Sequence, residues 1–168
     1  MEKVYLLLGG NMGNRHLLIK QMRDAIQSTI GNISQCSSLY ESEPWGFTHN
    51  NQFLNQVVEC QTLLNPIPLL KAIHRIEEEL GRVRVGDGYS ARTADIDILF
   101  YGNRIEVSDE LTIPHKHLHE RRFTLLPLAE VAPSLKHPLL NKSIMELLQS
   151  CSDNSRVEMI HEIEVLPQ

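Results

Sequence analysis

Two aspartates interrupt an otherwise apolar, β-branched run, RTADIDILFYG, which extends from Arg92 to Gly102. Strands normally avoid Asp, so Asp95 and Asp97 need a compensating partner if this run is a strand. Alternate side chains of a strand share a face, which places both carboxylates and Leu99 on one side, with their Cα atoms about 7 Å apart. The same alternation predicts three residues on the opposite face: Ile96, Ile98 and Phe100.

Two carboxylates on one face are unfavourable unless a cation lies between them. Ligands that offer only oxygen favour a hard ion, and a carboxylate pair that leaves positions open for phosphate is typical of Mg²⁺. Asp95 and Asp97 are therefore candidate metal ligands. The alternative is an exposed strand face whose acids pair with nearby arginines, because a DxD pattern alone is common.

Arginines surround the two aspartates in sequence. Arg82, Arg84 and Arg92 lie in the preceding glycine-containing loop, and Arg121 and Arg122 follow in IPHKHLHERRF. The planar guanidinium suits phosphate through paired hydrogen bonds, so carboxylates beside arginines indicate a nucleotide site. A solvated loop that balances local acids remains the alternative, above all for Arg84 and Arg122.

Other phosphate and metal motifs are weaker. No GxxxxGK[ST] loop occurs, since GGNMGN lacks the lysine, so phosphate charge would be met by metal ions and arginines. The HKHLH run offers three histidines but no obvious further ligands. We expect a turn in which His115, fixed by Pro114, alone reaches the phosphates.

Composition predicts one compact domain over residues 1–168, with 42% hydrophobic and 22% charged residues. The formal net charge of -5 disfavours general binding to nucleic acid. Cys36, Cys60 and Cys151 show no CxxC spacing, which argues against a disulfide framework or zinc ribbon and indicates a reducing, cytoplasmic location. The apolar run after Met1 is too short for a signal peptide or membrane span, so we expect no membrane partner.

Periodicity outlines the elements that position these residues. We expect a buried strand over Lys3–Gly9, then a helix that ends at Gly31-Asn32. ISQCSSLYESEPWG and QFLNQVVECQTLL are predicted to form two strands, joined by a polar loop too long for a tight hairpin. A second helix opens at Asn65-Pro66 and ends at Gly81. RRFTLLPLAEVAP and KSIMELLQS are expected to be short helices, and VEMIHEIEV a final edge strand.

The order βαββαβ predicts an α+β class fold, a ferredoxin-like sandwich with an antiparallel sheet covered by helices on one face, plus C-terminal additions.

The motifs GGNMGNR, YESEPWG, FLNQVV, EEELGRVR, RTADIDILFYG and IPHKHLHERRFTLLPLAEVAP follow one another between Val4 and Pro133. Together they resemble the 6-hydroxymethyl-7,8-dihydropterin pyrophosphokinase family of folate biosynthesis. The resemblance implies a ferredoxin-like transferase that moves pyrophosphate from ATP to the hydroxymethyl group of a reduced pterin and releases AMP. It also implies two Mg²⁺ ions on Asp95 and Asp97, one bridging the α- and β-phosphates and one bridging β and γ.

The resemblance extends to substrate contacts. Arg82 and Arg92 would belong to a mobile catalytic loop, so the implied catalytic set comprises Arg82, Arg92, Asp95 and Asp97. The implied ATP contacts are Arg82, Arg84, Arg92, Ile98, Thr112, His115 and Arg121. The implied pterin contacts are Ser42, Pro44, Trp45, Phe53, Asn55, Tyr89 and Phe123. Phe53 and Asn55 share one strand face, as this slot requires. Core packing is the other reading of Phe53 and Phe123.

Several positions depart from the family pattern: Gly10 replaces Ser, Tyr89 replaces Trp, Ser90-Ala91 replace Gly-Pro, and Glu110 stands where a basic residue can help bind nucleotide. Tyr89 can still stack on a bound pterin.

Two other functions fit the same residues. One is a different Mg²⁺-dependent transferase that uses ATP on another alcohol. The other is a non-catalytic ferredoxin-like module that binds a small ligand or RNA, against which stand the acidic net charge and the lack of an RNP-type aromatic motif. We expect a monomer that acts on small molecules.

Overall fold

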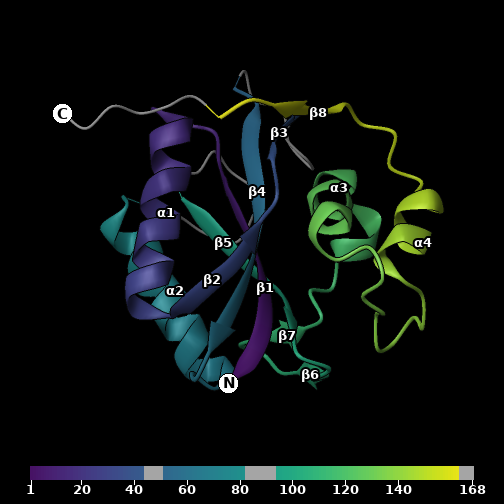
Figure 1. The fold of residues 1–168 in the computed structure, drawn as a ribbon, viewed down its shortest axis with the longest axis horizontal. Helices are drawn as coiled ribbons and strands as arrows, with labels where there is room; N and C mark the ends of the chain where they lie inside the picture. Colours follow the sequence, from purple (N-terminus) through teal and green to yellow (C-terminus); the bar gives the residue numbers. More distant parts are fainter. Residues whose placement is uncertain (44–50, 82–93, 163–168) are drawn as a thin grey trace.

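A computed structural model of the chain describes residues 1–43, 51–81 and 94–162 (Figure 1). Its elements are β1 (Glu2–Gly10), α1 (Arg15–Thr29), β2 (Gly31–Cys36), β3 (Leu39–Ser42), β4 (Phe53–Thr62), α2 (Pro66–Glu79), β5 (Asp95–Tyr101), β6 (Glu106–Val107), β7 (Thr112–Ile113), the 3-10 turn η1 (Leu118–Glu120), α3 (Arg122–Val131), α4 (Ile144–Gln149) and β8 (Val157–Ile160).

The main sheet runs in the order β5-β1-β4-β3-β8, and β2 also pairs with β4. Every pairing in it is antiparallel, as predicted. From β1 to β5 the elements follow the predicted order, and β8 forms the predicted edge strand beside β3. The fold is therefore a mixed α and β structure in which β5 and β8 are the outer strands of the path.

The expected strand over ISQCSSLYESEPWG is divided into β2 and β3, which both pair with β4. The division falls at Ser37, whose Oγ accepts the backbone N–H of Val57 at 3.0 Å, while its carbonyl accepts from Gln56 Nε2 at 2.7 Å. A serine that hydrogen-bonds nearby backbone competes with the regular ladder, which explains the interruption.

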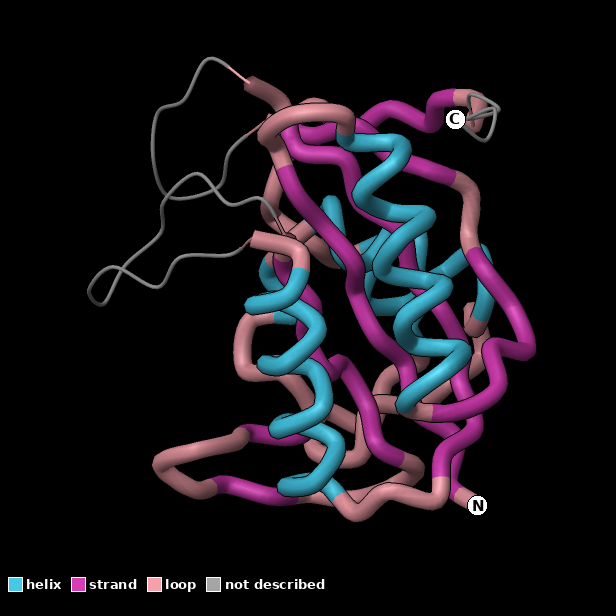
Figure 2. Tube along the Cα trace, turned by 90° about the vertical axis from the view of Figure 1, so that its left-hand side faces the viewer, coloured by secondary structure: helices cyan, strands magenta, loops and turns pink. Residues whose placement is uncertain are grey.

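Helices cover both faces of the sheet, so the expectation of a single covered face is wrong (Figure 1). Figure 2 shows α1 and α2 side by side over one face, where they bury Val4, Leu6 and Leu8 of β1. The opposite face packs Tyr5 and Leu7 against α3 and α4. Because β1 is buried on both sides, its sequence is a continuous apolar run rather than an alternating one.

Local sequence signals determine where helix α1 begins and ends. Asn14 caps α1, where its side chain accepts the backbone N–H of Leu17 at 3.1 Å. Helix α1 ends at Thr29, and Gly31 already belongs to β2, where a Cβ would lie 2.0 Å from the Gln61 carbonyl oxygen. Glycine at this position therefore allows two strands to approach closely, in addition to following the end of the helix.

A β-bulge alters the face alternation of β5. Tyr5 pairs with Phe100 and Leu6 pairs with Ile98, which leaves Leu99 as an extra residue. Leu99 and Phe100 consequently both pack on the side of α3, whereas Ile96 and Ile98 pack on the side of α1 and α2. The prediction that Phe100 shares a face with Ile96 and Ile98 is therefore wrong.

The short helices α3 and α4 lie where the sequence predicts them. No helix within the described ranges has the length and apolar character needed to cross a bilayer.

Candidate functional site

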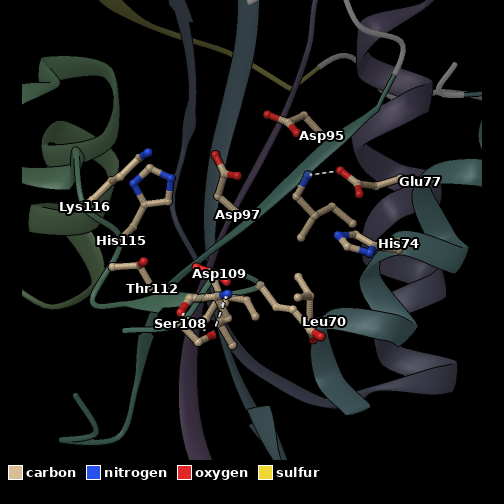
Figure 3. Close-up of a pocket in the computed structure, with 14 residues that line it drawn as sticks. Leu70, His74, Glu77, Asp95, Asp97, Ser108, Asp109, Thr112, His115 and Lys116 are labelled. Atoms are coloured by element: carbon tan, nitrogen blue, oxygen red, sulfur yellow. Dashed lines mark hydrogen bonds between the residues drawn. The ribbon is translucent and has the colours of Figure 1, made fainter. Parts of the chain in front are cut away.

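A pocket of about 330 Å³ lies against the outer strand β5 (Figure 3). Strand β5 supplies Asp95 and Asp97, helix α2 supplies Leu70, His74 and Glu77, and the segment 108–116 supplies the remaining wall. The predicted residues Ile98, Thr112 and His115 also line it. The structure therefore brings together five of the residues that the sequence assigned to metal and nucleotide.

The two aspartates project from β5 at this pocket, and both are partly exposed (Figure 3). Asp97 pairs with Leu7 and Asp95 pairs with Gly9 across the ladder with β1, so both carboxylates lie on the face that carries α3. Within the described parts of the chain, no three His, Cys, Asp or Glu side chains gather into a metal-binding group. Among the described residues, Asp95 and Asp97 thus form a pair of oxygen donors rather than part of a larger ligand cluster.

Glu77 holds the start of β5 in place. Its carboxylate, only 1% exposed, accepts the backbone N–H of Ile96 at 3.1 Å, and Ile96 lies between the two aspartates. A buried carboxylate that accepts a backbone N–H in this way fixes the strand that carries Asp95 and Asp97. The sequence interpretation missed Glu77 and His74. The signal was their placement beside the apolar stripe of α2, at i+7 and i+4 from Leu70.

His115 follows the cis Ile113-Pro114 bond, and its backbone N–H donates to the Leu99 carbonyl at 3.0 Å. Its Nδ1 accepts the backbone N–H of His117 at 3.2 Å, which assigns the proton of the neutral ring to Nε2. Burial, reinforced by the charge of Arg121, lowers the pKa of His115 to about 4. At neutral pH the side chain is therefore an uncharged hydrogen-bond donor.

The other two histidines of HKHLH bind elsewhere. His117 Nδ1 lies 2.9 Å from Glu120 Oε2, and the His119 ring stacks edge-on near His137, with centroids 6.3 Å apart. Neither residue lines the pocket. Of the three histidines, only His115 lines the pocket, and its contact with phosphate stays a prediction.

A second group of predicted residues lies farther along the sheet. Asn55 and Ser42 are both buried, and Asn55 Nδ2 donates to Ser42 Oγ at 2.8 Å. Phe53 is partly buried and pairs with Ser42 across β3 and β4. Ser42, Phe53 and Asn55 are thus neighbours, and their contact with a heterocycle stays a prediction.

Phe123 and Arg121 stand at the start of α3. The guanidinium carbon of Arg121 lies 5.7 Å from the Phe123 ring centroid, a cation–π contact, and Arg121 is 6% exposed. Phe123 packs partly against the core on this face. The remaining predicted site residues lie outside the described ranges: Pro44, Trp45, Arg82, Arg84, Tyr89 and Arg92.

The two groups are connected by one row of the sheet. Asp95 pairs with Gly9 across β5 and β1, and Gly9 pairs with Asn55 across β1 and β4. Directly opposed residues of antiparallel strands project to the same face, so Asp95 and Asn55 flank Gly9 at a Cα separation of about 10 Å. Gly9 is buried, and the Asn55 amide oxygen lies 3.0 Å from the position that a Cβ of residue 9 would take.

Comparison with known proteins identifies relatives of this chain. Residues 5–133 match the model of the 7,8-dihydro-6-hydroxymethylpterin-pyrophosphokinase (HPPK) family. The chain is 42% identical over 141 residues to the 2-amino-4-hydroxy-6-hydroxymethyldihydropteridine pyrophosphokinase of Porphyromonas gingivalis, covering 82% of this chain and 95% of that protein. It is 36% identical over 163 residues to the Haemophilus influenzae protein of the same name, covering 95% and 99% respectively.

Solved structures share the fold at lower identity. A crystal structure of an HPPK-DHPS protein in complex with substrates superposes with a TM-score of 0.74 at 15% identity, over 89% of this chain. The wild-type HPPK-DHPS of Plasmodium falciparum with SDX-DHP gives 0.72 at 20% identity. This chain spans 43% of the length of each of those two chains.

Proposed function

Because the chain belongs to the 7,8-dihydro-6-hydroxymethylpterin-pyrophosphokinase family, we propose that it transfers pyrophosphate from ATP to 6-hydroxymethyl-7,8-dihydropterin in folate biosynthesis. The products are AMP and the pterin diphosphate. The main support for this proposal is the cross-strand row Asp95–Gly9–Asn55. It brings the carboxylate-lined pocket next to an amide that can hydrogen-bond the edge of a heterocycle.

The pocket at β5 is the proposed nucleotide site. Ile98 and Thr112 would contact the adenosine portion, while His115 and Arg121 would contact the triphosphate, together with Arg82, Arg84 and Arg92. His115 contributes the Nε2–H as a neutral donor, because its pKa of about 4 leaves the ring uncharged near pH 7. Positive charge must therefore come from the arginines and from metal ions.

The proposed pterin slot lies at the Asn55 end of the row. One Asn55 N–H is occupied by Ser42 Oγ, which orients the amide so that its oxygen points toward Gly9. In this orientation the oxygen can accept an N–H of the pterin edge. Phe53 and Phe123 would enclose the ring, with Tyr89 and the backbone near Ser42, Pro44 and Trp45 completing the slot.

Asp95 and Asp97 are the proposed ligands of two Mg²⁺ ions. Both are partly exposed carboxylates on one strand face, and oxygen-only donors with open positions suit Mg²⁺ bound to substrate phosphates. Magnesium bound there would neutralise phosphate charge and lower the pKa of the attacking hydroxyl. Glu77 supports both ligands by fixing the Ile96 backbone between them.

The proposed reaction depends on how the two substrates are positioned rather than on a covalent intermediate with the protein. The pterin hydroxymethyl oxygen bonds to the β-phosphorus, the bond from that phosphorus to the α–β bridging oxygen breaks, and the hydroxyl proton leaves to solvent. Such transfers pass through a loose transition state, so in-line placement and charge neutralisation dominate. Arg82 and Arg92 would close over the developing charge, and we assign no dedicated general base.

We also assign the α+β arrangement to the ferredoxin-like type. The supporting observation is the strand order β5-β1-β4 with β2 and β3 beside β4, in which α1 and α2 form the two connections. In this assignment α3, α4 and β8 are C-terminal additions: α3 and α4 cover the second face of the sheet, and β8 extends its edge beside β3.

The metal and carboxylate roles are tested together by Asp97→Asn and Asp95→Asn. We expect either variant to slow AMP formation at saturating Mg²⁺ on the order of 100-fold, because each removes a charge that holds the phosphates in line. Asp24→Asn, at an exposed position paired with Lys20 on α1, is the matched control and should leave turnover unchanged. Near-normal turnover by Asp97→Asn would refute the metal assignment.

A further inference from the structure

The chain segment between α4 and β8 contacts two elements that carry proposed pterin contacts. It lies beyond residues 5–133, which the family model matches. At one end Asp153 hydrogen-bonds the first residue of α3, and at the other end β8 pairs with β3. Figure 1 shows this segment running from α4 past α3 to the edge of the sheet beside β3.

Asp153 caps helix α3. Its Oδ2 accepts the backbone N–H of Arg122, the first residue of the helix, at 2.9 Å, and its Oδ1 accepts the N–H of Ser155 at 2.9 Å. The first N–H groups of a helix have no partner within the helix itself. Arg121 stands at the N-cap position, but a guanidinium only donates hydrogen bonds and cannot accept a helix N–H. The acceptor is therefore supplied by a residue 31 positions later in the chain.

The charge of Asp153 suits this role. Although burial raises the pKa of Asp153, hydrogen bonds from Ser155 and from the Arg122 backbone lower it overall, below the usual range of an aspartate. The side chain is therefore a carboxylate at neutral pH. A negative charge at a helix N-terminus is stabilised by the helix dipole, and a charged acceptor binds an N–H more strongly than a neutral one.

The capped turn carries Phe123, which directly follows Arg122. The Phe123 side chain packs partly against the core on this face of the sheet. The far end of α3 has a separate anchor, because the Glu130 carboxylate accepts the hydroxyl of Tyr40 on β3 at 2.7 Å. Loss of the Asp153 cap would therefore loosen the Phe123 end of the helix while the Glu130 end stays attached to the sheet.

The other end of the segment is fixed at Ser42. Val157 of β8 pairs with Ser42 of β3, and the Ser42 hydroxyl accepts from Asn55 Nδ2 at 2.8 Å. Only four residue steps separate Asp153 from Val157, and four steps span at most about 14 Å. The segment thus limits how far the start of α3 can move from the strand edge that carries Ser42.

We propose that Asp153 is a positioning residue of the pterin slot, which holds Phe123 of α3 at a fixed separation from Ser42 and Asn55 of the sheet. This inference rests on the proposed function, because it takes these three residues to be pterin contacts. Asp153 itself does not need to touch the pterin. The nucleotide pocket has its own attachment to β5 through the His115 N–H and the Leu99 carbonyl, so the expected effect is on pterin affinity.

The test compares Asp153→Ala, which removes the acceptor, with Asp153→Asn, which keeps an oxygen at the same position. Asn154→Ala, at the exposed neighbouring position, is the matched control. Calorimetric titration with 6-hydroxymethyl-7,8-dihydropterin, in the presence of Mg²⁺ and an ATP analogue that is not turned over, measures Kd for the pterin. Titration with the analogue alone measures Kd for the nucleotide. Amide hydrogen exchange at Arg122 reports directly whether the cap is formed.

We expect Asp153→Ala to accelerate exchange at Arg122 and to raise Kd and KM for the pterin about fivefold, with Kd for the nucleotide and kcat changed by about twofold at most. Asp153→Asn should restore Kd for the pterin to about the wild-type value, because its amide oxygen still accepts the Arg122 N–H.

Four results would overturn the proposal: unchanged exchange at Arg122 in Asp153→Ala, an unchanged pterin Kd despite faster exchange, an equal loss of affinity for pterin and nucleotide, or an equal rise of the pterin Kd in Asn154→Ala. Failure of the proposed function would look different, because the wild-type protein would then bind no pterin or form no AMP.

Discussion

Asp95 and Asn55 occupy the same cross-strand row of the sheet, separated only by Gly9. The row joins the carboxylate-lined pocket at β5 to the buried Asn55–Ser42 pair on β4 and β3. Since both side chains project to one face, a ligand that lies across Gly9 can touch both. In the proposed function, this relationship would place the nucleotide and the pterin side by side on one face of the sheet.

Gly9→Ala should displace the Asn55 amide. A Cβ at Gly9 would lie 3.0 Å from Asn55 Oδ1, closer than an ordinary contact, so the amide must shift. We expect KM for the pterin to rise about tenfold while KM for ATP stays within twofold, measured by steady-state turnover. Asp24→Asn, at the exposed position of α1 paired with Lys20, is the control, because it lies on neither β1 nor β4. Equal effects of the two variants would mean that Gly9 has no special role.

Ser42 is expected to act through Asn55. Asn55→Ala removes the amide and should weaken pterin binding by about 1–3 kcal/mol, the usual range for a hydrogen bond at a buried polar group. Ser42→Ala should give a smaller loss, and Ser42→Thr should preserve binding because it keeps the hydroxyl that accepts from Asn55 Nδ2. Calorimetric titration with the pterin in the presence of Mg²⁺ and an ATP analogue checks this order. Ser34→Ala, at an exposed serine of β2, should change nothing in pterin affinity.

Glu77→Ala should cost both stability and activity. The change leaves the buried N–H of Ile96 without its acceptor, which lowers the free energy of unfolding by about 1–3 kcal/mol. Glu77→Gln retains an oxygen acceptor and should lose less. Chemical denaturation and AMP formation provide the two readouts, with Glu78→Ala on the exposed side of α2 as control. If Glu77→Ala unfolds at the wild-type denaturant concentration, the support of β5 by Glu77 is wrong.

His115 gives stability a specific pH dependence. Its pKa falls from 6.5 in the unfolded chain to about 4 in the folded one, so the unfolded state binds more protons between these values. The stabilising contribution is therefore complete above pH 6.5 and is lost as pH falls toward 4, by about 2 kcal/mol after allowance for partial exposure of the ring.

The comparison that isolates this contribution uses His115→Gln. Urea denaturation of the wild type and of this variant, with a chelator present, should show a difference that narrows as pH decreases from 6.5 to 4. His161→Gln, at an exposed position after β8, should follow the wild-type curve. Parallel curves for wild type and His115→Gln across this range would contradict the assigned pKa shift.

Much of this arrangement could be predicted from the sequence because its signals are local. Three such signals are the apolar run of β1, the apolar stripe of α2 and the Asn65-Pro66 pair at the start of α2. Each depends only on residues close in sequence, and both elements lie where expected. The convergence of Asp95, Asp97 and His115 on one pocket was likewise predicted, because strand alternation and the turn at Pro114 constrain it.

Other features depend on contacts between distant residues. The bulge at Leu99 arises from pairing with Tyr5 and Leu6, which no local pattern in β5 reveals. The apolar content of α3 indicates burial but not which face of the sheet it covers, so its packing against Tyr5 and Leu7 could not be predicted. Glu77 and His74 were missed because single polar residues on a helix resemble ordinary solvated positions unless the pocket that they line is known.

The central claim is pyrophosphoryl transfer, and it is tested most directly by phosphorus NMR of a mixture of this protein, ATP, Mg²⁺ and 6-hydroxymethyl-7,8-dihydropterin. We expect AMP and a pterin diphosphate to appear in equal amounts, and only when the pterin is present. Formation of ADP with a pterin monophosphate, or no pterin-dependent consumption of ATP, would contradict it.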